Sequence, residues 1–317
     1  MVSFNAIDDA NLDPDLNYFY SDATYNAESN CKFYTVHEFN GEFFGGDSGL
    51  TIVGCNVRSF QANIDKLLSI FYNETPDVLV ISESWFNLDS CQNLDGYNAY
   101  HTVNMRPTGR GGGVSMFIKP ELMPKPVSEL SYSNSAIEVN TNQISSNGLN
   151  AFIVGIYRPH EGDVYNFTEA LLEILNNPIL ANKFVVIVGD MNVNILLTET
   201  RTDHFVNSLR SLHFVPMIDK PTRFPTIPGH SPSLLDHFWV NKIDNYLSGV
   251  VSIDVSDHCP IFMKVPFIRH ENNNSRIKVS FRIQNDQNIE KLAYRLLNYE
   301  IGPQFIVQIV IYMLIDF

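Results

Sequence analysis

The stretch Phe184-Val185-Val186-Ile187-Val188 runs directly into Gly189-Asp190-Met191-Asn192. A continuous run of β-branched residues is typical of a strand that is buried on both faces. The glycine ends the run, and a carboxylate and a carboxamide follow at positions i and i+2, so both side chains can point the same way. Enzymes with α/β folds place their chemistry at such strand ends, although an ordinary Asx turn would have the same sequence.

Five other apolar runs end in the same way, each beside a polar side chain that can take part in chemistry. These side chains are Asn56, Glu83, Tyr157, Asp236 and the adjacent pair Asp257-His258. One such ending is common in proteins, but six in one chain predict a shared polar cleft.

The predicted cleft is rich in carboxylates and contains a histidine. Oxygen ligands of this kind suit Mg²⁺, and Mn²⁺ suits the same set. The chain has no Gly-x-Ser-x-Gly elbow, and Gly109–Gly113 lacks the Lys-Ser/Thr ending of a Walker A sequence. These features favour metal-assisted hydrolysis of a phosphate ester.

Composition and charge limit the classes of protein to which the chain could belong. The chain has 317 residues, of which 44% are hydrophobic and 18% charged, as expected for a globular protein. Its net charge of −14 argues against tight electrostatic capture of nucleic acid, but it does not exclude a nuclease with acidic metal ligands. We expect an acidic, loosely ordered arm over residues 1–49, one catalytic domain over 50–267, and a linker with a short C-terminal helical tail over 268–317.

Strands outnumber helices in residues 50–267, and helices lie between some strand pairs. This pattern predicts an α/β fold, a four-layer α/β sandwich in which two packed mixed β-sheets are flanked by helices. The four cysteines form no CxxC pair and fit a reducing compartment. With no signal peptide or transmembrane helix visible, we expect an intracellular monomer, nuclear or cytoplasmic, that does not bind membranes.

Taken together, the polar motifs resemble those of the endonuclease/exonuclease/phosphatase superfamily. More narrowly, they resemble the apurinic-type endonuclease domain of LINE-like (non-LTR) retrotransposon polyproteins. The matching stretches, in family order, are Asn56-Val57-Arg58-Ser59, Ser82-Glu83-Ser84-Trp85, Gly109–Gly113, Ile156-Tyr157-Arg158-Pro159, Gly189-Asp190-Met191-Asn192, Ser233-Leu234-Leu235-Asp236 and Ser256-Asp257-His258. The resemblance implies a Mg²⁺-dependent endonuclease that nicks DNA and leaves a 3′-hydroxyl. No reverse transcriptase sequence follows, so we expect a chain truncated before that enzyme.

The resemblance also implies roles for single residues. Glu83 would be the principal metal ligand, with Asn56 beside it and Asp257 towards the metal. The implied catalytic residues are Tyr157 on the scissile phosphate, Asp190 on the attacking water, Asn192 hydrogen-bonding nearby, and His258 on the phosphate, oriented by Asp236. Adjacent strand residues point to opposite sides, so Asp257 is poorly placed to orient His258, and Asp236 is the better partner.

Six further residues are candidates for supporting or DNA-binding roles: Ser233, Ser256, Arg58, Arg110, Arg158 and Arg223. The serines could equally be turn residues, and the arginines could be solvated. Arg58 stands where apurinic repair enzymes carry an acid, which favours the retroelement branch. We expect Trp85 to lie in the core.

Two alternative functions stay open. One is a phosphatase of the same superfamily that acts on a small phosphate ester. The other is a catalytically silent, retroelement-derived protein that only binds partners.

Overall fold

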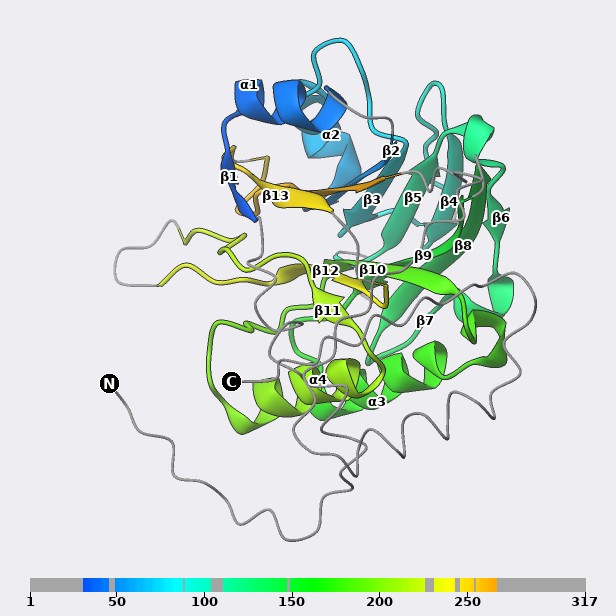
Figure 1. Cartoon of the computed structure of the whole chain (residues 1–317), viewed down its shortest axis with the longest axis vertical. Coiled ribbons are helices and arrows are strands. Elements are labelled where there is room, and N and C mark those ends of the chain that lie inside the picture. The colour runs from blue at the N-terminus through cyan, green and yellow to red at the C-terminus, as the bar shows by residue number, and fades with distance from the viewer. Residues whose placement is uncertain are drawn as a thin grey trace, which may run out of the picture. The chain divides into compact units, whose positions relative to one another are not determined.

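The computed structural model describes residues 31–45, 49–87, 89–103, 111–146, 149–225, 231–242, 246–253 and 255–266. In these residues, two seven-stranded sheets pack face to face, and helices cover the outer face of each sheet (Figure 1). The predicted four-layer α/β sandwich is therefore confirmed.

The first sheet joins both ends of the described chain. Its order is β1 (Lys32–Tyr34), β13 (Leu247–Val251), β14 (Ile261–Pro266), β2 (Gly49–Asn56), β3 (Val78–Ser82), β5 (Val114–Ile118) and β4 (Asn98–Thr102). The pairs β2–β3 and β1–β13 are parallel, and the other neighbours are antiparallel.

The second sheet is built around the strand that opened the sequence analysis. Its order is β11 (Val215–Pro216), β12 (Asp236–Val240), β10 (Phe184–Asp190), β9 (Leu149–Tyr157), β8 (Glu138–Ser146) and β6 (Lys125–Pro126), and β7 (Tyr132–Ser133) also pairs with β8. Only β9 and β10 are parallel, so both sheets are mixed as predicted.

The helices bury one face against the sheets, and side chains cap the N-termini of two of the longer ones. On the first sheet lie α1 (Val36–Phe39), the π-helix Asn40–Phe44 and α2 (Phe60–Leu68); on the second lie α3 (Val164–Leu175) and α4 (Thr200–Ser211). Ser59 caps α2 and Asp163 caps α3, each accepting a hydrogen bond from a main-chain N–H of the first turn. Short 3₁₀ helices span Pro120–Leu122, Ser128–Leu130 and Pro178–Leu180.

The interface between the sheets changes from apolar to polar along each strand. In β2, Gly54 and Asn56 share one face because they are two residues apart, and in β10 the same is true of Val188 and Asp190. Val188 lies against Gly54, and Asn56 contacts Asp190. The hydrophobic core therefore continues directly into the polar strand ends.

Two glycines set how closely the sheets approach. A Cβ atom on Gly54 would lie 2.7 Å from Val188 Cγ2, and one on Gly155 would lie 2.9 Å from Val80 Cγ1. Real Cβ atoms do not come this close to a neighbour. Both positions thus need glycine for packing, whatever their backbone angles.

Residues 31–45 differ from the expectation of a loosely ordered arm. β1 extends the first sheet, and Tyr34, Phe39 and Phe43 are fully buried with their rings against Phe262 of β14. Three aromatic side chains supply enough apolar area to hold a segment whose overall composition is polar. Residues 1–30, Gly46–Ser48 and the predicted linker and tail over 268–317 lie outside the described residues. No helix among the described residues is long and apolar enough to cross a membrane.

Candidate active site

Asn56 joins the two sheets at their polar edge. Its Nδ2 donates to Glu83 Oε1 over 2.9 Å and to Asp190 Oδ2 over 2.8 Å, and its Oδ1 accepts from the Arg58 main-chain N–H. The side chain is fully buried. Three bonds in fixed directions hold the two carboxylates in place relative to one another.

Glu83 receives hydrogen bonds on both carboxylate oxygens. Oε1 also accepts from the Tyr157 hydroxyl over 3.3 Å, and Oε2 accepts from Trp85 Nε1 over 3.1 Å. The backbone of Glu83 has φ of 52°, a left-handed conformation that few non-glycine residues adopt. The expectation that Trp85 lies in the core is wrong: its indole bonds a site carboxylate and it is 37% exposed.

Asp190 and Asn192 form the Asx turn that the sequence allowed, and this turn lies in the site. Asp190 Oδ1 accepts from the Asn192 main-chain N–H over 2.9 Å, and Asp190 N donates to the Ser82 hydroxyl over 3.2 Å. Burial, and then the charge of Asp236, raises the pKa of the Asp190 carboxyl. A carboxylate with a raised pKa is a better proton acceptor near neutral pH.

His258 pairs with Asp236, as the alternation argument predicted. Its Nδ1 lies 2.7 Å from Asp236 Oδ2, and both side chains are buried. Burial lowers the pKa of His258, but the charge and hydrogen bond of Asp236 outweigh it and raise the pKa to about 9. The imidazole is therefore positively charged at neutral pH.

Thr222 supports the His258–Asp236 pair and was not predicted from the sequence. Its hydroxyl donates to Asp236 Oδ2 over 2.7 Å and accepts from the N–H groups of Leu235 and Asp236. Thr222 lies in a loop and not at the end of an apolar run, so the pattern of strand ends gave no sign of it. Ser82, at the end of β3, was also missed as a support for Asp190.

Asp257 was predicted to face a metal, but arginines occupy both of its oxygens. Arg58 Nη1 donates to Oδ1 over 3.0 Å, and Arg223 Nε donates to Oδ2 over 2.8 Å. Burial would raise the pKa of Asp257, but Arg223, His258 and Arg58 lower it. A ligand role for Asp257 stays a prediction, which its two arginine partners do not favour.

Arg158 does not face DNA, which corrects that prediction. It is 5% exposed, and its guanidinium donates to the carbonyls of Met191, Asn192, Pro159 and Gly162. A guanidinium has five donors in a fixed plane, so it can satisfy several loop carbonyls at once. Arg158 therefore holds the loop that carries Asn192.

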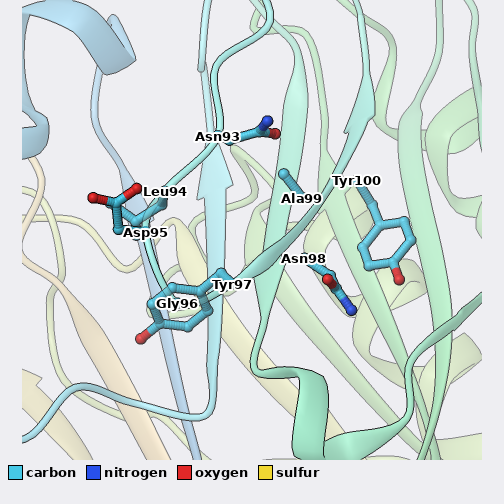
Figure 2. Close-up of a pocket in the computed structure, with 8 residues that line it drawn as sticks. All are labelled: Asn93, Leu94, Asp95, Gly96, Tyr97, Asn98, Ala99 and Tyr100. Carbon is cyan, nitrogen blue, oxygen red and sulfur yellow. The ribbon is translucent and has the colours of Figure 1, made fainter.

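The remaining predicted residues divide into three cases. The Ser256 hydroxyl donates to Asn56 O over 2.7 Å and accepts from His258 N, so it supports the site. Ser233 pairs with Arg223 only through main-chain bonds. Arg110 lies outside the described residues. A separate pocket along residues 93–100, which reach into the start of β4, contains none of the predicted residues (Figure 2).

Sequence comparison identifies the family. The model of the Endonuclease/Exonuclease/phosphatase family matches residues 23–258, which is well over half of the chain. The chain belongs to this family. None of the curated protein sequences compared with the chain is significantly similar to it.

Solved structures with the fold of this family superpose on the chain. The endonuclease domain of TRAS1, a telomere-specific non-LTR retrotransposon, has a TM-score of 0.54 at 14% identity, over 69% of this chain and 99% of its own. AP endonuclease LMAP from Leishmania major has a TM-score of 0.51 at 18% identity, covering 68% and 87%. The 3′ phosphatase NExo from Neisseria, bound to a product DNA hairpin, has 0.51 at 14%, covering 68% and 99%. At these identities the likeness concerns the fold.

The donor set in this member of the family fits a divalent cation. One ligand atom each from Asp190, Asp236 and His258 lie within 4.8 Å of one another. Asp236 Oδ1 is buried and has no hydrogen-bond partner among the described residues, so it is an oxygen that a cation could satisfy. Glu83, predicted as the principal ligand, is linked to this group through Asn56. Carboxylate oxygens are ligands of Mg²⁺ and Mn²⁺, whereas the His258 ring, charged and paired with Asp236, stays outside the ligand set.

Proposed function

We propose that this protein is a metal-dependent DNA endonuclease of the retrotransposon type, which hydrolyses a phosphodiester bond and leaves a 3′-hydroxyl. The observation that carries the proposal is the Asn56 amide, which ties Glu83 to Asp190 beside the His258–Asp236 pair. This arrangement brings together a carboxylate for the metal (Glu83), a proton acceptor (Asp190) and a positively charged imidazole (His258) at the polar edge of the two sheets. Family membership and the seven ordered motifs support the same proposal.

The residues divide the chemistry of hydrolysis among them. Asp190, whose raised pKa suits proton transfer, accepts a proton from the attacking water, and Asn192 and Asn56 fix its orientation. His258, held as a cation by Asp236, donates to a non-bridging phosphate oxygen and stabilises the charge that grows there. The Tyr157 hydroxyl lies beside Glu83 and is positioned to contact the same phosphate.

A divalent cation held by Glu83 would neutralise charge on the phosphate and on the leaving oxygen. The leaving oxygen becomes the 3′-hydroxyl of the nicked strand. The hydroxide of the water becomes part of the new 5′-phosphate, the 3′-oxygen takes up a proton from solvent, and Asp190 returns the proton that it accepted to solvent, so that one water is consumed in total.

Nicking of supercoiled plasmid in the presence of Mg²⁺ tests the proposal. Asp190→Asn and His258→Gln should each lower the rate at least about 100-fold, because each removes a proton-transfer or charge-stabilising group. Arg210→Gln, an exposed position in the last turn of α4, is the matched control and should nick like the wild type. Extension of the nicked product by a DNA polymerase reports the 3′-hydroxyl.

Three results would count against the proposal in different ways. Equal nicking by wild type and both variants would refute the assigned mechanism. A nick that polymerase cannot extend would refute the predicted product. If the wild type left DNA intact but released phosphate from an inositol phosphate, the phosphatase alternative would replace the endonuclease.

A further inference from the structure

Two arginines and one aspartate form a charged strip next to His258. Arg58 follows Asn56 by two residues, Arg223 follows Thr222, and Asp257 precedes His258, so each lies close in sequence to a residue of the candidate active site. A β-bridge also joins the main chain of Arg223 to that of His258. The strip is therefore fixed to the site through the backbone.

Each guanidinium bonds the aspartate through only one of its nitrogens. Arg58 bonds Asp257 through one Nη atom and Arg223 through Nε, and their other nitrogens have no protein partner among the described residues. The two side chains are 50% and 40% exposed, whereas that of Asp257 is 16% exposed. Two positive charges against one negative charge leave a net charge of +1 on a chain whose total is −14. Arginine donors in a fixed fork match the oxygens of a phosphate group.

An exposed aromatic pair adjoins the arginines. Phe224 directly follows Arg223, and its main-chain N–H donates to the carbonyl of Asp257 over 3.4 Å. Its ring lies 6.1 Å from that of Phe33 on β1, and the two residues are 38% and 40% exposed. Apolar rings left in solvent beside arginines are the surface on which unpaired bases stack in proteins that bind single strands.

We propose that the charged strip (Arg58, Asp257 and Arg223), together with the phenylalanine pair Phe224 and Phe33, binds the DNA strand beside the cleavage site. The arginines hold a backbone phosphate next to the scissile one, and a base that has left the duplex stacks on the phenylalanine pair. Asp257 is the positioning residue that fixes both guanidinium groups. The proposal rests on the endonuclease function and specifies a preferred substrate: DNA with unpaired nucleotides next to the cleaved bond.

Fluorescence anisotropy with a labelled DNA duplex that carries a short unpaired extension tests the proposal, in EDTA so that no cleavage occurs. Arg58→Gln and Arg223→Gln should each weaken binding and lower the slope of log affinity against log salt by about 0.9, the loss of one phosphate contact. Phe224→Ala should weaken binding to this probe about tenfold and leave the salt slope unchanged. On a blunt duplex, Phe224→Ala should have little effect.

Matched controls lie elsewhere on the surface. Arg210→Gln in α4 removes the same charge, and Tyr72→Ala removes an aromatic ring that is 55% exposed; both should bind like the wild type. Wild-type salt slopes and affinities in the Arg58, Arg223 and Phe224 variants would overturn the inference, as would a Phe224→Ala loss that is equal on both probes. Because binding is read without cleavage, a protein that binds as expected but never nicks would refute only the endonuclease function.

Discussion

Replacing Thr222 by valine should destabilise the protein strongly although no apolar contact is lost. Thr222 is fully buried, and its hydroxyl makes three hydrogen bonds, one to Asp236 Oδ2 over 2.7 Å and two from main-chain N–H groups over 3.1 Å each. Valine has the same shape without the hydroxyl. The substitution therefore isolates the polar interactions.

The magnitude follows from the groups left without partners. Two buried N–H donors lose their acceptor, at about 1–3 kcal/mol each, and the Asp236 carboxylate loses a donor. The added methyl group returns about 1 kcal/mol through apolar burial. We expect Thr222→Val to lower the free energy of unfolding by about 3 kcal/mol.

Urea unfolding at neutral pH measures this loss from the midpoint and the slope of the transition. Thr222→Ser is the control, because serine keeps the hydroxyl and gives up only one methyl group, which costs about 1 kcal/mol. If Thr222→Val were as stable as Thr222→Ser, the hydroxyl would not hold the Asp236 strand end, and the reasoning would fail.

Three further predictions concern other residues. Burial lowers the pKa of His237 to about 4 from 6.5, so the unfolded chain takes up a proton first as pH falls. The free energy of unfolding of the wild type, relative to that of His237→Phe, should therefore drop by about 1.4 kcal/mol per pH unit below 6.5. A difference between the two proteins that does not change with pH would contradict this. Mn²⁺ should change the tryptophan fluorescence through Trp85, which bonds Glu83, and the same response in Trp85→Phe would exclude that origin. Arg158→Lys should cost about 3 kcal/mol in urea unfolding, because lysine cannot satisfy the four carbonyls; a loss below about 1 kcal/mol would show that water replaces the guanidinium.

The site could be predicted largely because strand alternation is simple. Asn56 and Asp190 each end an apolar run, and a two-residue period carries the buried face of the strand straight to the polar end. The same period, applied to Asp257 and His258, pointed to Asp236 as the partner of His258; the structure contains this pair, although residues 255–257 form a bend and not a strand. Local sequence thus contained most of the geometry.

Other features depend on contacts that sequence spacing does not encode. Arginine is usually a surface residue, and only the folded loop supplies the carbonyls that pair with the buried Arg158 guanidinium. Trp85 is apolar in composition, but a left-handed turn with φ of 59° directs its indole to a carboxylate. Hydrophobicity scales rank both side chains in the wrong direction.

Strand β8 shows the same limit for the fold. Only Ile137 and Val139 are apolar near its start, but the strand continues through Asn140, Thr141 and Asn142, which are buried. Asn142 Nδ2 bonds Asn140 Oδ1, and the Thr141 hydroxyl bonds the carbonyl of Leu130. Polar residues that find hydrogen-bond partners in the folded chain can fill a core strand, and this cannot be recognised from a hydrophobic pattern.

The glycines at the sheet interface bear on how this enzyme fold can vary. Asn56 belongs to one sheet and Asp190 to the other, so their 2.8 Å contact exists only at one separation of the sheets. Gly54 and Val188, one pleat deeper, fix that separation. A single methyl group added there, remote from any reacting atom, would increase the distance between the groups that share the chemistry. Sequence change in the apolar interior is therefore limited by catalysis as well as by folding. A larger residue at Gly54 should be recovered only with a smaller side chain at Val188, and one at Gly155 only with a smaller side chain at Val80.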